Sequence, residues 1–115
     1  MRELTQHMVA QLVSAVTGWL TSDHELFLWG RRRLQLMRVY NVREGIDCNY
    51  DTLPNRFFTD PVDAGRHRGA VLDRAVFTES GQQYYELMGW DACGEPTADT
   101  LTSLGLRWAI SHQFR

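Results

Sequence analysis

The sequence predicts an all-α fold, a small irregular domain of about four helices with a long loop between the second and the third. Apolar residues return every three or four positions in four separate stretches, the period of an amphipathic helix. Each stretch begins near a residue typical of a helix N-cap and ends near a glycine. No stretch shows the strict alternation of a β-strand. We therefore expect residues 1–115 to form a single helical domain.

The first predicted helix begins after Thr5 and ends at Gly18. The Thr5 hydroxyl can accept a hydrogen bond from a free backbone N–H of the first turn. Gly18 can adopt the left-handed conformation that terminates many helices. Residues at three- and four-residue spacing predict one buried side: Met8, Val9, Leu12, Val13 and Val16.

The second predicted helix begins at about Asp23 and continues to Gly45. Ser22 and Glu25 have the spacing of a capping box, in which each side chain satisfies a backbone N–H of the other residue. The consecutive residues Arg31–Arg33 must fan around the helix, so at least one is expected to pair with a carboxylate. The predicted buried side contains Leu26, Leu34, Met37 and Tyr40, with Phe27 as a less regular member.

A long irregular connection is predicted between positions 45 and 72. Pro54, Pro61 and Gly65 interrupt the helical period there, and no strand pattern replaces it. Loops of more than about 15 residues are uncommon inside compact domains. Such a segment more often wraps over another surface or lines a site, which is a first indication that this chain has a partner.

The third predicted helix begins after Asp73, which can act as its N-cap, and ends at Gly89. An interior glycine costs about 1 kcal/mol relative to alanine, so Gly81 predicts a weak helix with a kink or break near Ser80. Its predicted apolar side contains Val76, Phe77, Tyr84, Leu87 and Met88.

The fourth predicted helix is short. Thr97 is its expected N-cap, and Gly105 is its expected end. The following tail, residues 106–115, contains Trp108, Ile110 and Phe114. Two outcomes are open for this tail: it extends the helical part or it hangs free.

Composition restricts the class of function. The chain has 115 residues, of which 43% are hydrophobic and 23% charged, with a net charge of -2. This balance is typical of a globular domain and gives no field that would attract nucleic acid. A charged helix face is therefore favoured for Arg31–Arg33 over contacts with a nucleic-acid backbone. No apolar run is long enough for a membrane span and no signal-peptide pattern is present, so we expect a cytoplasmic protein without a membrane partner.

No metal or cofactor site is predicted. Cys48 and Cys93 lack the spacing of a zinc or iron–sulfur motif, so both are expected to be reduced thiols. The four histidines show no paired ligand spacing, and exposed or cap positions are favoured for them: His7, His24, His67 and His112.

Two polar loop features have a chemical alternative. Residues 66–68, Arg-His-Arg between glycines, could bind a phosphate, but a solvated basic loop is favoured because no phosphate-binding motif accompanies them. Paired carboxylates could serve acid–base catalysis, but a structural use in polar loops is favoured for Asp47 with Asp51 and for Asp60 with Asp63. No catalytic residue is predicted.

Several segments resemble a known family in the same order and at compatible spacing. Residues 41–45, Asn-Val-Arg-Glu-Gly, and 51–57, Asp-Thr-Leu-Pro-Asn-Arg-Phe, look like the late-chain signature of the aldehyde:ferredoxin oxidoreductases. Residues 15–19 resemble the segment upstream, and residues 84–91 resemble the segment downstream. The likeness runs from about Leu12 to Leu106, and it places Trp19 and Trp90 as anchors beside helix ends.

This resemblance implies a function for a longer protein. In the family, this region belongs to an all-helical domain that packs against a base holding a tungsten bis-pterin cofactor and a [4Fe-4S] cluster. The family oxidises aldehydes to carboxylic acids and passes the electrons to ferredoxin. The family's cluster cysteines and its Asp-x-x-Gly-Leu pterin motifs have no counterpart here, so no catalytic, cofactor-binding or metal residue carries over. Cys48 stands where relatives usually have a charged residue, and Gly81 where they tend to have a large apolar one.

The resemblance predicts a C-terminal helical segment that is inactive alone and helps to cover the cofactor site. Its partner would be the remainder of the oxidoreductase. The expected docking residues are Asn41, Arg43, Glu44, Asp51 and Arg56. The alternative is a stand-alone helical interaction module derived from that domain, in its simplest form a homodimer.

Overall fold

The computed structural model describes residues 4–112 and confirms the all-α fold class. Within this range the chain contains helices and irregular segments but no β-strand. The elements are α1 (Gln6–Thr17), α2 (Asp23–Arg43), the 3-10 turn η1 (Cys48–Tyr50), α3 (Arg56–Thr59), α4 (Arg74–Met88), α5 (Ala98–Ser103) and the 3-10 segment η2 (Arg107–His112). No helix among these residues is long and apolar enough to cross a membrane.

The predicted N-caps are confirmed for all four main helices. Thr5 caps α1, Asp73 caps α4 and Thr97 caps α5, each accepting from backbone N–H groups of the first turn. At the start of α2, the Ser22 side chain and the Glu25 side chain form the reciprocal capping box.

The helix ends also agree with the prediction, with one exception. Gly18 and Gly89 have φ angles of 76° and 71°, the left-handed conformation that glycine adopts without steric cost. Of the kink or break predicted near Ser80, the break was wrong, because α4 is continuous from Arg74 to Met88. The intrinsic cost of one interior glycine is smaller than the combined stabilisation from a good cap and a packed helix end.

The core lies at one end of the molecule, where the C-terminal half of α2 meets α5 and η2. It is a cluster of buried aliphatic residues: Val39, Leu101, Leu104, Leu106 and Ala109, with Leu28, Leu36 and Ile110 packed against it. The tail therefore extends the helical part through η2 and contributes to the core. Phe114, named in that prediction, lies outside the described residues.

The predicted buried side of α2 was wrong. Leu34, Met37 and Tyr40 are 42%, 49% and 56% exposed, whereas Gln35 and Arg38 are buried. The predicted apolar sides of α1 and α4 are also largely exposed, as shown by Leu12 and Val16 in α1 and by Val76 and Leu87 in α4. Trp19, an expected anchor, is exposed as well. Sequence period identifies an apolar face, but no described segment of the chain covers it.

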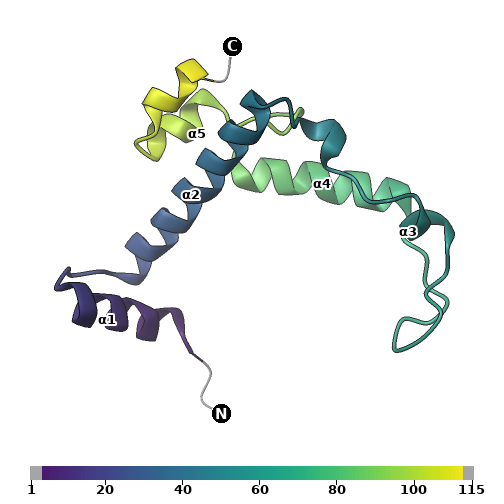
Figure 1. Cartoon of the computed structure of the whole chain (residues 1–115), viewed down its shortest axis with the longest axis horizontal. Coiled ribbons are helices and arrows are strands. Elements are labelled where there is room, and N and C mark those ends of the chain that lie inside the picture. The colour runs from purple at the N-terminus through teal and green to yellow at the C-terminus, as the bar shows by residue number, and fades with distance from the viewer. Residues whose placement is uncertain (1–3, 113–115) are drawn as a thin grey trace.

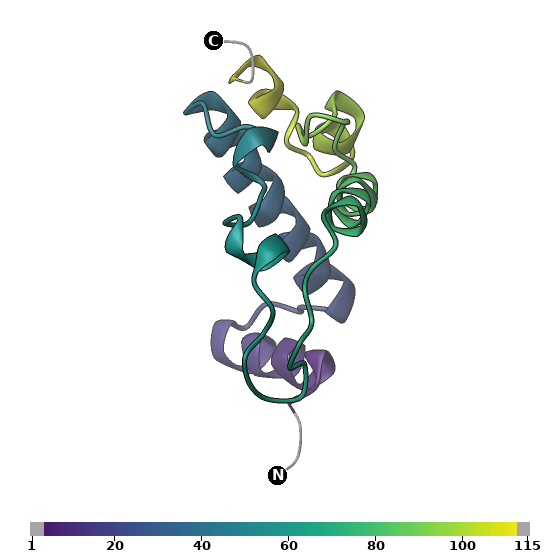
Figure 2. The ribbon, with the colours of Figure 1, turned by 90° about the vertical axis from the view of Figure 1, so that its right-hand side faces the viewer.

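The molecule is open and flat. Its radius of gyration is 18.6 Å and its extents are 52 × 48 × 21 Å, whereas a compact domain of this length has a radius of about 13 Å. In Figure 1, α2 and α4 diverge from the core end, and α1 lies at the far end of α2. Figure 2 shows the same shape from the side. The extended form explains why so few apolar residues are buried.

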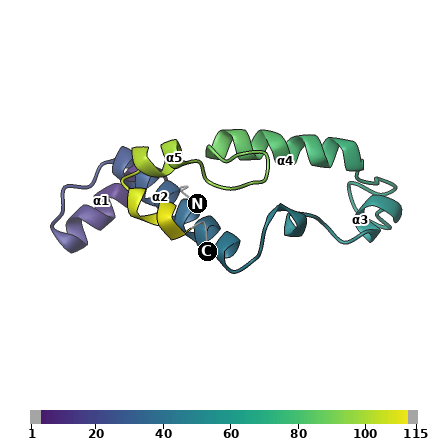
Figure 3. The ribbon, with the colours of Figure 1, turned by 90° about the horizontal axis from the view of Figure 1, so that it is seen from above.

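The long connection between α2 and α4 is irregular, as predicted, apart from η1 and α3. Residues 62–70 form a narrow arm, in which Val62 N–H donates to the Ala70 carbonyl at 3.0 Å and Gly69 N–H donates to the Val62 carbonyl at 2.8 Å. Figures 1 and 3 show this arm beyond α3, far from the core. The exposed residues Arg66–Arg68 lie in this arm.

Candidate functional site

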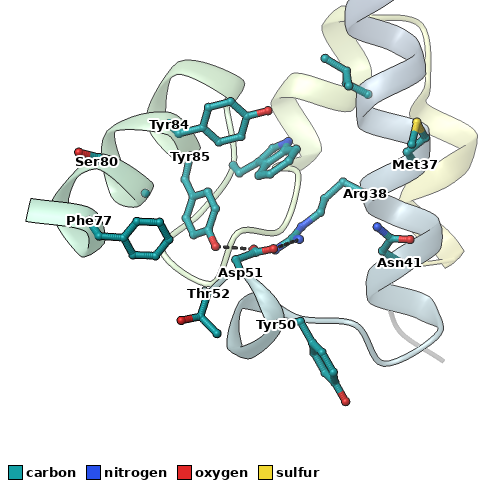
Figure 4. Close-up of a pocket in the computed structure, with 13 residues that line it drawn as sticks. Met37, Arg38, Asn41, Tyr50, Asp51, Thr52, Phe77, Ser80, Tyr84 and Tyr85 are labelled. Atoms are coloured by element: carbon teal, nitrogen blue, oxygen red, sulfur yellow. Dashed lines mark hydrogen bonds and ion pairs between the residues drawn. The ribbon is translucent and has the colours of Figure 1, made fainter. Parts of the chain in front are cut away.

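The largest hollow lies between α2, η1 and α4, where the two long helices diverge. It has a volume of about 570 Å³ and is open to solvent. Figure 4 shows Met37 and Asn41 on the α2 side, Phe77 and Tyr84 on the α4 side, and Asp51 between them. Its walls are mainly aromatic and aliphatic, which is typical of a surface that binds an apolar group.

Arg38 connects the three segments around this hollow. Its guanidinium donates to both carboxylate oxygens of Asp51, with N···O distances of 3.0 and 2.6 Å. Its Nε donates to the Gly94 carbonyl at 2.7 Å, in the turn after α4. The guanidinium also lies over the Trp90 ring, 4.9 Å from its centroid. A planar group with five N–H donors can make such contacts together, which lysine cannot.

Tyr85 completes this group by donating its hydroxyl to Asp51 at 2.5 Å (Figure 4). Burial alone would raise the pKa of Asp51, but hydrogen bonds from Arg38 and Tyr85 outweigh it and lower the pKa. Burial and the Asp51 carboxylate raise the pKa of Tyr85 to about 12. Burial alone would lower the pKa of Arg38, but Asp51 raises it. All three groups therefore keep their charge states at neutral pH, which suits a structural role.

Gln35 makes a second polar link between α2 and the end of α4. It is fully buried, and its amide donates to the Met88 carbonyl at 2.8 Å. Its amide oxygen accepts from the Trp90 indole N–H at 2.7 Å. Gln35 and Arg38 lie one helical turn apart, so together they fix how the end of α4 meets α2.

The five predicted docking residues do not form a single cluster. Asn41 and Asp51 line the same hollow, whereas Arg56 lines a separate one beside α3. Arg43 and Glu44 pair with each other at the exposed end of α2. Docking through these residues stays a prediction.

Arg38 and Gln35 were missed by the sequence-based prediction. Neither belongs to the apolar stripe predicted for α2. A signal was present, since Gln35, Arg38 and Val39 have the three- and four-residue spacing of one helix face. The expected carboxylate partner of the arginine cluster was wrong: the arginines of α2 that form ion pairs are Arg38 and Arg43, and none of the pairs involves Arg31–Arg33 within the described chain.

Other candidate residues have structural roles. Asp47 caps η1 by accepting from the Asn49 N–H at 2.9 Å. Asp51 is held by Arg38 and Tyr85, and the preference for a structural use of this carboxylate agrees with these contacts. Among the side chains that the structure describes, those of residues 4–110, no three from His, Cys, Asp or Glu converge as a metal would require.

Comparison with protein families identifies the class to which this helical architecture belongs. The family model for aldehyde ferredoxin oxidoreductase, domains 2 and 3, matches residues 1–106. The chain therefore belongs to the aldehyde ferredoxin oxidoreductase family, as the resemblance predicted.

Individual relatives agree with this assignment. The chain is 32% identical over 96 residues to the tungsten-containing aldehyde ferredoxin oxidoreductase of Pyrococcus horikoshii and 30% identical to that of Pyrococcus furiosus. Each match covers 83% of this chain but only 15% of the relative. The chain thus spans about 15% of the length of the curated relatives it matches.

A solved structure shows the same fold. The active-site complex BamBC of benzoyl coenzyme A reductase, in complex with 1,5-dienoyl-CoA, matches with a TM-score of 0.75 and 24% identity. The match covers 94% of this chain and 15% of that chain. This open helical shape is therefore found as a small part of a much larger molecule.

The described residues do not fit the [4Fe-4S] cluster that the family implies. Such a cluster requires four ligands, commonly cysteine thiolates. Cys48 and Cys93 are the cysteines of this sequence, and no metal-binding group surrounds them among the described residues.

Proposed function

We propose that this chain is the C-terminal helical segment of an aldehyde:ferredoxin oxidoreductase and works by docking on the rest of that enzyme. In the assembled enzyme it covers the part that holds the tungsten bis-pterin and the [4Fe-4S] cluster. The whole enzyme converts aldehydes to carboxylic acids in the cytoplasm and passes the electrons to ferredoxin. The isolated chain is inactive.

The exposure of apolar helix faces carries this proposal. Leu34 and Met37 of α2 and Tyr84 of α4 line the open hollow, each between 42% and 49% exposed. Burial of apolar surface contributes about 25 cal/mol per Å², so covering these faces would stabilise the assembly considerably. Contiguous exposed apolar surface of this kind marks interaction sites. The matched relatives are several times longer than this chain, which gives these faces a natural partner.

The predicted docking residues lie at several places along the exposed side of the chain. The Asn41 side chain is half-buried beside the hollow and makes no hydrogen bond within the described chain. Arg43 and Glu44 form an exposed pair at the end of α2, and Arg56 lies against the Phe57 ring on α3. Asp51 is held in place by Arg38. In the proposal these groups contribute the polar rim of the interface, and the apolar walls contribute its centre.

Co-expression tests this proposal. The partner would be the polypeptide from the same source that carries the cluster cysteines and the pterin motifs. We expect the two to co-purify as a complex containing tungsten and iron, with aldehyde-dependent reduction of ferredoxin. The separate chain should contain neither metal. A chain that binds tungsten or iron by itself would contradict the proposal.

A matched pair of variants tests the docking face. Leu34→Asp places a charge on the apolar wall of α2, and we expect it to prevent complex formation. Arg32→Asp, on the same helix and also exposed, should assemble normally. Helix content measured by circular dichroism should be unchanged in both free variants. Equal assembly of the two variants would exclude this face as the interface.

A free-standing interaction module remains the second candidate, because the same exposed faces could bind a second copy of the chain. Light scattering of the purified chain distinguishes the two. A stable dimer whose formation is blocked by Leu34→Asp would favour the homodimer, whereas a monomer that binds the larger polypeptide would favour the enzyme segment.

A further inference from the structure

The two cysteine-bearing loops are held together by one arginine. Arg38 donates to Asp51, which directly follows η1, and η1 begins at Cys48. The same guanidinium donates to the carbonyl of Gly94, the residue after Cys93. A Cβ atom at Gly94 would lie 2.5 Å from Arg38 Nη2 and 2.8 Å from Tyr85 Cζ. The turn that carries Cys93 is therefore packed tightly against the group that holds η1.

Other contacts bring the two cysteine-bearing segments close together. Cys48 and Ala92 line one hollow of about 280 Å³ between η1, α4 and the following turn. Gln82 of α4 donates to the Ala92 carbonyl at 3.4 Å, which holds the turn over this hollow.

The electrostatic environment of Cys93 agrees with this proximity. The negative charge of Asp91 contributes most to a raised pKa of Cys93, and the nearby Cys48 thiol adds to it. Both cysteines are free thiols; Cys93 is exposed and Cys48 is half-buried. An external reagent can thus reach Cys93 first, with Cys48 adjacent to it.

We propose that Cys48 and Cys93 form a reversible intramolecular disulfide that links η1 to the turn after α4. The oxidant would be a low-molecular-weight disulfide, such as oxidised glutathione. The Cys93 thiolate attacks one sulfur of this reagent, which releases one thiol and leaves a mixed disulfide on Cys93. The Cys48 thiolate then attacks the Cys93 sulfur and releases the second thiol. Two protein thiols become one disulfide, and the reagent is reduced by two electrons to two thiols.

This inference goes beyond the proposed function and does not depend on it. The bond would hold together the two segments that Arg38 already connects, namely the turn at residues 91–95 and η1 with the Asp51 that follows it. A cross-link between distant positions mainly restricts the unfolded chain, so it should raise the unfolding midpoint. Reduction by an added dithiol would reverse the effect.

The experiment uses the full 115-residue chain, incubated with a glutathione redox buffer under native conditions and in urea. We expect a mass lower by two hydrogen atoms, and a proteolytic peptide pair that joins Cys48 to Cys93. The ratio of cross-linked to reduced protein should be at least about tenfold higher in the native chain than in urea, because the fold holds the thiols close together.

Single variants complete the test. Cys48→Ser and Cys93→Ser should each give only a mixed disulfide with glutathione and no rise in the unfolding midpoint after oxidation. Mixed disulfides or intermolecular dimers alone in the unmodified chain would overturn the proposal. Equal cross-linking in native conditions and in urea would also overturn it, because the fold would then contribute nothing.

Discussion

The two ends of the molecule are stabilised differently. At the core end, α2, α5 and η2 enclose aliphatic residues such as Leu101 and Ala109, both 0% exposed. At the outer end of α2, Ala10 is the buried residue of α1, and mainly polar contacts join α1 to the start of α2 and the turn before it. Examples are Gln6 to the Asp23 carbonyl at 2.9 Å and the Thr21 N–H to Ser14 Oγ at 3.0 Å. One end therefore resembles a small independent core, whereas the other resembles half of an interface.

The segment around α3 resembles the outer end of α2, because it buries few apolar side chains. Phe58 and Phe77 pack edge to face at 5.5 Å, and Arg74 lies over the Phe58 ring at 4.0 Å. These contacts attach α3 to the start of α4 but leave Val76 and Val62 exposed. Local structure in such regions depends on caps and pairs of side chains, and the described chain leaves much of their apolar surface exposed.

The largest predicted effect is in the core. Leu101→Ala should lower the free energy of unfolding by about 3 kcal/mol, because it removes a fully buried side chain and leaves a cavity. Leu87→Ala, at an 80% exposed position of α4, should change it by less than about 0.5 kcal/mol. Urea unfolding followed by circular dichroism measures both. Similar effects of the two substitutions would remove the distinction between core and outlying helix.

The next largest effect on the free energy of unfolding compares a partly buried ion pair, Arg38–Asp51, with an exposed one, Arg43–Glu44. Arg38→Met should cost about 2 kcal/mol, since Asp51 loses two charged hydrogen bonds in a partly buried setting. Arg43→Met disrupts the exposed pair with Glu44 and should cost between about 0 and 1 kcal/mol. Both values come from the same unfolding experiment. An equal loss in the two variants would show that Arg38 does not organise the site.

Stability should also depend on pH through Asp51 and Tyr85. The lowered pKa of Asp51 contributes stability at neutral pH that is lost as the pH falls through that value in acid. Tyr85, with its pKa raised to about 12, contributes stability below the ordinary tyrosine pKa that is lost as the pH rises from 10 to about 12. Tyr85→Phe should therefore flatten the alkaline part of the thermal-stability profile. An unchanged alkaline part would contradict the assignment.

The smallest effect should be favourable. Gly81 lies inside α4, and a Cβ atom there would meet no atom within 4 Å. Gly81→Ala should therefore raise the free energy of unfolding by about 0.5 to 1 kcal/mol. Gly89→Ala is the contrasting control: it should be destabilising, because φ is 71° and the Cβ would lie 2.2 Å from Thr100 Oγ1. Calorimetry of both variants would measure the difference.

Local features of this fold were predictable from sequence, whereas its packing was not. Thr5, Ser22 and Asp73 act as caps because each needs only a backbone within its own helix turn. The burial of Leu34 could not be judged in the same way. Its apolar character is visible in the sequence, but its exposure depends on what packs against α2, and the sequence period carries no information on that.

In the candidate site, too, a residue could be named from the sequence but its long-range contacts could not be predicted. Asp51 was named as a docking residue from a family motif, yet its contacts with Arg38 and Tyr85 join positions far apart in the sequence. No periodic pattern indicates such a meeting. The family itself was recognisable, because motifs in a fixed order identify a relative even where the long-range contacts are not predictable.

The Gln35 amide has one further consequence. It donates to the Met88 carbonyl and accepts from the Trp90 indole, so the side chain must offer opposite hydrogen-bonding polarity on its two terminal atoms. A carboxylate at this position would place an acceptor against the Met88 carbonyl, and leucine would leave both groups without a partner. Of side chains of this length, only glutamine satisfies both groups, which makes position 35 a direct probe of whether α4 ends against α2 in the assembled protein.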